Sequence, residues 1–96
     1  MANTDLLVRL KNGVEQWNSW VRNNYSAKDL SGADLRGTCL LGAHLNLVDL
    51  SQANLSGANL IDAHLQRANL TGADLQSARL TNADLFSACL RDANLT

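Results

Sequence analysis

Several ingredients common in small domains are scarce in this 96-residue chain. Proline is absent, aromatic residues make up 4%, and cysteine occurs twice, at Cys39 and Cys89. Two cysteines are too few for a disulfide framework, and their spacing does not match a metal site. Eight basic and nine acidic residues leave a formal net charge of −1. No strong electrostatic field therefore points to nucleic acid or an anionic membrane as a partner.

Long apolar segments are missing as well. Asp5, Arg9 and Lys11 interrupt the N-terminal segment, which lacks the apolar region of a signal peptide. No stretch approaches the ~18 apolar residues of a membrane span. We therefore expect a cytoplasmic protein of one small domain, with its cysteines reduced.

What the chain does contain is a five-residue repeat. Leucine occupies every fifth position from Leu30 to Leu95, and alanine stands two positions before it in eleven of fourteen repeats. The residue between them, here called the middle position, is often Asp or Asn. The two residues after the leucine are commonly polar residues or glycine. The departures from alanine are Lys28, Thr38 and Val48.

A period of five does not suit either regular secondary structure. On an α-helix, five residues rotate the side chain by roughly 140° beyond a full turn, so the leucines would scatter around the axis. On a straight strand, an odd period sends alternate leucines to opposite faces. A backbone that turns a corner once per repeat directs every leucine inward, and Gly, Ser and Asn suit such corners. Four right-angled corners would close one coil, and stacked coils would lie ~4.8 Å apart.

The repeats Ala-Asn-Leu-Ser-Gly at 53–57 and Ala-Asp-Leu-Gln-Ser at 73–77 resemble the bacterial pentapeptide-repeat family. The resemblance covers some seventy residues and implies an all-β solenoid. It implies a right-handed quadrilateral β-helix of about three and a half coils within residues 25–96, with the leucines stacked inside.

Residues 1–24 follow a different period. The apolar residues Leu6, Leu10, Val14, Trp17 and Val21 form a stripe at helical spacing, which predicts one amphipathic helix from about residue 4 to 22, with Gly13 inside it. The segment with tryptophans at 17 and 20 is also similar to leaders of cyanobacterial pentapeptide-repeat proteins. We expect this helix to cap the first coil, because an open coil exposes strand edges and apolar interior. A membrane anchor is disfavoured because the polar face is not rich in Lys or Arg.

Folding the sequence at a period of twenty shows which outward residues stack. His44, His64 and Asp84 share one column, whose residue types could hold Zn²⁺, although a solvated ladder is the favoured interpretation. Leu41 and Ile61 stack below Thr81. This apolar ladder meets a partner, is covered by the leader, or is a set of incidental exposed residues. Cys39 and Cys89 fall on different faces, too far apart for a disulfide.

No residue is predicted to be catalytic or to bind a metal or cofactor. The serines at 31, 51, 56 and 77 lie at corners, where turn chemistry explains them, and a core filled with leucine leaves no substrate pocket. The sequence favours a noncatalytic structural or protein-interaction module. The alternative implied by the family is a DNA mimic that modulates a type II topoisomerase. The repeat region carries seven acidic against five basic residues over a short length, which disfavours that alternative.

The final residues, 91–96, form an ordinary repeat. Leu80, Leu85, Leu90 and Leu95 would then line an open coil end, with the outward aromatic Phe86 at its rim. We expect a second copy to cover this end about a two-fold axis, forming a weak homodimer. The alternative is a different solenoid chain that continues the coil.

Overall fold

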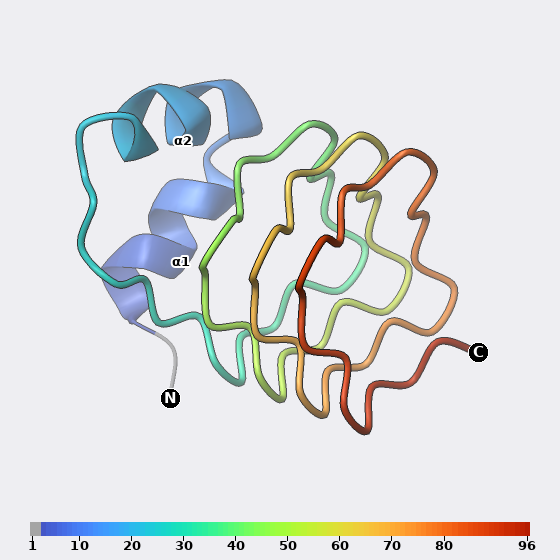
Figure 1. The fold of residues 1–96 in the computed structure, drawn as a ribbon. Helices are drawn as coiled ribbons and strands as arrows, with labels where there is room; N and C mark the ends of the chain where they lie inside the picture. The colour runs from blue at the N-terminus through green and yellow to red at the C-terminus, as the bar shows by residue number, and fades with distance from the viewer. Residues whose placement is uncertain (1–2) are drawn as a thin grey trace.

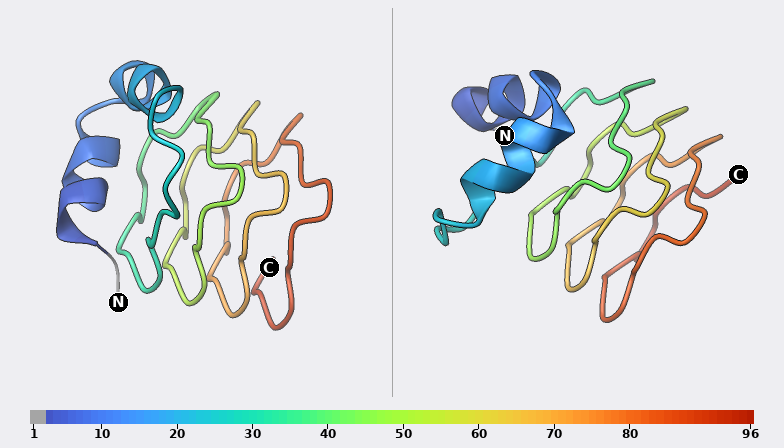
Figure 2. Two further views of the ribbon diagram at one scale, coloured as in Figure 1. Left: turned by 60° about the vertical axis from the view of Figure 1, so that its left-hand side comes forward. Right: turned by 90° about the horizontal axis from the view of Figure 1, so that it is seen from above.

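The computed structural model describes residues 3–96 and has two parts, a helical leader and a solenoid. Helix α1 spans Thr4–Lys11 and helix α2 spans Val14–Val21. The remaining chain winds into stacked coils of similar outline, with the two helices at one end of the stack and the C-terminus at the other (Figures 1 and 2).

The coils repeat every twenty residues, so four pentapeptides make one turn. Parallel bridges join middle positions twenty apart, such as Asp29 to Asp49, Asn54 to Asp74 and Asn59 to Arg79. Each pairing involves a single residue, and residues 3–96 contain no longer strand. The predicted solenoid is therefore present, but its sides are too short for regular strands, because a corner interrupts pairing after every few residues.

The interior is the predicted stack of leucines. From Leu30 to Leu75 every repeat leucine is buried, and the alanines from Ala43 to Ala73 at the preceding inward position are buried beside them. Between coils the leucine N–H groups donate to carbonyls nineteen residues on, as in Leu60 to Arg79 at 2.7 Å. Apolar packing and backbone pairing thus stabilise the same side of each coil.

The middle position has a turn-forming role. Each Asp or Asn there accepts a hydrogen bond through Oδ1 from the backbone N–H two residues later, for example Asn59 from Ile61 at 3.1 Å. Side chains of this type favour turns for this reason. Nine of the fourteen middle positions carry the bond, at residues 29, 34, 49, 54, 59, 69, 74, 84 and 94. The middle position therefore contributes to turn formation, and we expect it to tolerate fewer substitutions than its mixed residue types suggest.

The prediction of one leader helix is wrong in one respect, because the leader forms two helices. Gly13 separates them with φ 137° and ψ 141°, a conformation that side-chain-bearing residues rarely adopt. Asn3 caps α1, its Oδ1 accepting the Leu6 N–H at 3.2 Å. The break lets α1 and α2 follow different directions over the coil end (Figure 2).

Candidate interaction surface

The two ends of the solenoid present the same type of surface, and the helices cover one of them. Leu6, Leu10 and Trp17 are buried in the common core with the repeat leucines, and Val14 and Val21 pack against it. The predicted apolar stripe therefore faces the first coil, as a capping segment requires.

Residues of the leader also form hydrogen bonds with the backbone at the edge of the first coil. The Trp17 Nε1–H donates to the His44 carbonyl at 2.8 Å. The Asn18 amide forms two bonds, accepting the His44 N–H at 2.8 Å and donating to the Gly42 carbonyl at 3.0 Å. The Asn3 N–H donates to the Asp29 carbonyl at 2.8 Å. The first coil is thus covered by apolar groups and paired at part of its edge.

The opposite end is the candidate interaction surface, here called the C-terminal end and formed by residues 77–96. Leu80, Leu85 and Leu90 are only half-buried, and Leu95 is 57% exposed, whereas Leu60 and Leu65 are fully buried. Phe86 is 71% exposed, in agreement with its predicted outward position. The surface is apolar because these inward positions have no further coil packed on them within the described chain.

The backbone of this end also offers unused hydrogen-bonding groups. One coil earlier, the N–H groups of Leu60, Leu65 and Leu70 donate to carbonyls nineteen residues on, at 2.7–2.8 Å. The equivalent N–H groups of Leu80, Leu85 and Leu90 have no such acceptor within residues 3–96. Apolar side chains and unpaired strand edges together are the features that favour pairing with another chain.

The structure brings together the predicted histidine column. His44 pairs with His64 and His64 with Asp84, and the two imidazole centroids lie 4.7 Å apart in an edge-to-face arrangement. Asp84 is already bonded, its Oδ2 accepting the Gln66 Nε2–H at 2.9 Å. Within the described chain, no group of three or more His, Cys, Asp or Glu residues is placed to hold a metal ion. Partial burial, followed by the charges of His64 and Arg22, lowers the pKa of His44.

The remaining candidate residues lie where the period places them. Leu41 is 48% exposed and Ile61 is half-buried, and their turns are joined by the Gly42 N–H donating to the Ile61 carbonyl at 2.9 Å. Cys39 and Cys89 are free, exposed and on different columns. A hydrogen bond with the Thr71 hydroxyl lowers the pKa of Cys89. Ser31 and Ser51 each donate a hydroxyl proton to the Asp side chain of their own turn.

The acidic side chains do not form a continuous stripe. Along one column Asp34 and Asp74 alternate with Asn54 and Asn94, and along another Asp29 and Asp49 give way to Asn69 and Cys89. Asp34 is neutralised by Arg36 in a salt bridge of 2.8 Å, whose hydrogen bonds lower the pKa of Asp34 to about 2. This mixed distribution does not resemble the regular negative charge of duplex DNA.

Sequence reasoning missed the capping hydrogen bonds of Trp17 and Asn18. Both residues stand in the helical stripe or next to it, and their side-chain polar groups carry no pattern that identifies a partner 24–27 residues away. The one signal in the sequence is a Trp on the apolar stripe, followed by Asn, in the segment that precedes the first repeat. An indole N–H needs a partner when it is buried, and a coil edge supplies one.

Comparison with known proteins identifies the repeat. A family model described as "Pentapeptide repeats" matches residues 29–67 and 63–96. The pentapeptide-repeat protein alr5209 of Nostoc PCC 7120 is similar in structure, with a TM-score of 0.51, 28% identity, and coverage of 97% of this chain and 75% of that one. No curated protein matches the chain.

Two further solved structures are similar at lower TM-scores. The protein Rfr23 of Cyanothece 51142 has a TM-score of 0.39 and 32% identity, covering 71% of this chain and 54% of its own. A thylakoid-lumen pentapeptide-repeat protein of Arabidopsis thaliana has a TM-score of 0.35 and 30% identity, covering 71% and 61%. This chain thus spans a little over half the length of these two. No helix in residues 3–96 has the length and apolar character needed to cross a bilayer.

Proposed function

Since this chain belongs to the pentapeptide-repeat family, whose architecture is a right-handed quadrilateral β-helix, we propose that it is a noncatalytic interaction module that binds through its C-terminal end. The observation that carries the proposal is the half-exposed set of leucines at 80, 85 and 90, whose backbone N–H groups have no inter-coil acceptor within residues 3–96. A cytoplasmic location is part of the same proposal.

A second copy of the chain is the proposed partner. Two identical ends that meet about a two-fold axis bring their apolar surfaces together, and each coil edge gains a second coil edge to pair with. The area is small, since one coil end offers a few hundred Å² against the ~800 Å² per partner of a standard interface. Association is therefore weak and depends on concentration. A different solenoid that continues the coil would use the same groups.

Sedimentation of the full chain over a wide concentration range tests the proposal. We expect a reversible monomer–dimer equilibrium that Leu90→Asp abolishes. Because Leu90 also packs in the last coil, Leu95→Asp is a second variant that alters a more exposed side chain. Val8→Asp places the same charge on an exposed residue of α1 and should leave the equilibrium unchanged. A wild-type chain that stays monomeric at millimolar concentration, or dimers disrupted by Val8→Asp alone, would contradict the proposal.

A further inference from the structure

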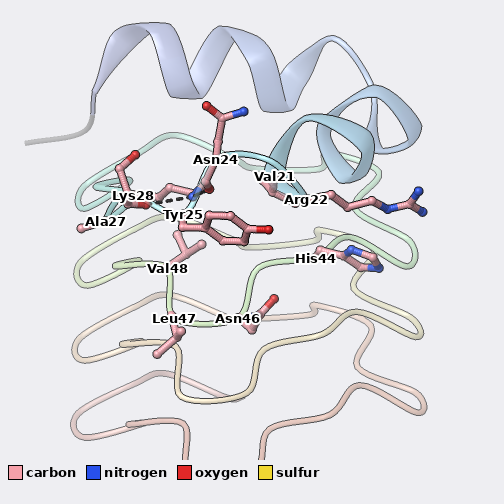
Figure 3. Close-up of a pocket in the computed structure, with 11 residues that line it drawn as sticks. Val21, Arg22, Asn24, Tyr25, Ala27, Lys28, His44, Asn46, Leu47 and Val48 are labelled. Atoms are coloured by element: carbon pink, nitrogen blue, oxygen red, sulfur yellow. Dashed lines mark hydrogen bonds between the residues drawn. The ribbon is translucent and has the colours of Figure 1, made fainter.

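A groove lies at the capped end of the solenoid, far from the C-terminal end. It runs between the segment that leaves α2, residues 21–28, and the last side of the first coil, residues 44–48. Its volume is about 530 Å³, within the ~300–1,000 Å³ range of small-molecule sites. Tyr25 is 89% exposed, and in Figure 3 its hydroxyl is directed toward the side of Arg22 and His44.

Three residues of this groove differ from the residue types that are commonest at their positions in the repeat, and Leu47 alone has no counterpart. Leu47 is 66% exposed with φ 65°, at a corner position that carries glycine or a polar residue in every other repeat. His44 replaces the Asp or Asn that forms the turn bond in most repeats. Val48 is larger than the alanine usual at its position. Residue types that suit the fold poorly are expected to cluster at functional sites.

The charged groups of the groove are basic. Its lining residues include Arg22 and Lys28 and contain no Asp or Glu. The Lys28 ammonium is already bonded to the carbonyls of Asn24 and Ser26. Arg22, in contrast, makes no ion pair within residues 3–96, so its guanidinium is free to bind an anion.

We propose that this groove binds a small organic anion with an apolar or aromatic body. The exposed Leu47 side chain and the Tyr25 ring contact the body, and the Arg22 guanidinium pairs with the carboxylate, sulfonate or phosphate. The Asn46 amide and the His44 imidazole lie on the same groove and supply further hydrogen bonds. This site is independent of the interaction proposed for the C-terminal end.

The probe for this site is 1-anilinonaphthalene-8-sulfonate, an aryl sulfonate whose fluorescence rises in apolar surroundings. Titration of the full chain should give saturable binding, with amide NMR shifts at Arg22, Tyr25 and Leu47. Arg22→Gln should weaken binding about tenfold, as expected for loss of a hydrogen bond between charged groups. The uncharged analogue N-phenyl-1-naphthylamine should bind weakly to both proteins.

Leu47→Gly separates a binding role from a structural one. Glycine accepts the positive φ of Leu47, so the substitution should leave the Tm unchanged or raise it, while weakening probe binding about threefold through lost apolar contact. Ser77→Gly makes the same backbone change on another face and should not alter binding. Absence of saturable binding, shifts confined to Leu80, Leu85 and Leu90, or full binding by Arg22→Gln would each overturn the proposal.

Discussion

The two ends of this solenoid differ although the repeat that builds them is the same. At the N-terminal end, Leu30, Leu35 and Leu40 are fully buried because α1 and α2 cover them. At the C-terminal end, Leu80 and Leu90 occupy equivalent inward positions and remain half-exposed. Burial here depends on what stacks on a coil, so identical repeats differ in stability and in availability for binding.

The largest expected effect is the contrast between a central and a terminal leucine. Leu60→Ala should lower the free energy of unfolding by about 2–5 kcal/mol, because a cavity opens between packed coils. Leu95→Ala should lower it by less than about 1 kcal/mol, because little of its side chain is removed from water. Urea denaturation at low protein concentration measures both. Similar losses would show that Leu95 is buried in solution.

The next effect concerns the covered end. Asn18→Ala removes the bonds to both the His44 N–H and the Gly42 carbonyl, and should reduce stability by about 1–3 kcal/mol. Ser19→Ala, at an exposed neighbouring residue, should change it by less than ~0.5 kcal/mol and is the matched control. Equal unfolding midpoints for the two variants would mean that the Asn18 amide does not substitute for a coil edge.

The smallest expected effect is a pH dependence of the folding stability that arises from His44 at the capped end. The pKa of His44 in the folded protein lies below its ordinary value of 6.5, so the unfolded chain takes up this proton first as the pH falls. The contribution of His44 to the free energy of unfolding is therefore complete above about pH 6.5. It is lost as the pH falls through the pKa of His44 in the folded protein.

His44→Asn should remove this part of the pH dependence. The substitution also provides the Oδ1 that forms the turn bond elsewhere in the repeat, so stability at neutral pH should rise by about 0.5–1.5 kcal/mol. Urea midpoints at pH 7.5 and pH 5 for both proteins test the prediction. If the urea midpoint changes equally between the two pH values in both proteins, the pH dependence arises from groups other than His44.

Much of the fold was predictable because the repeat is strict. The leucine period and the alanine two residues earlier fix which side chains face inward, and the columns of His44 with His64 and of Asp34 with Asn54 follow from a period of twenty. Phe86 is likewise outward, as predicted. Every repeat packs on its neighbours in the same way, so the local sequence pattern and the tertiary structure agree.

The leader was predicted less completely. Its apolar stripe indicated a helix that covers the first coil, but a single Gly13 in a helical pattern is equally compatible with a tolerated glycine and with a break. The capping bonds of Trp17 and Asn18 depend on how α2 is placed over the coil edge. The groove beside Tyr25 depends on that same placement, and no local period encodes it.

The twenty-residue period also relates the length of the chain to its geometry. Removing or inserting one pentapeptide would carry every later residue to the next side of the coil, so Phe86 would change faces relative to α2 although each repeat stayed intact. Removing or inserting four pentapeptides would preserve every column and only alter the distance between the ends. Natural or engineered length variants that keep both the groove and the C-terminal end in the same relative orientation should therefore differ by whole coils.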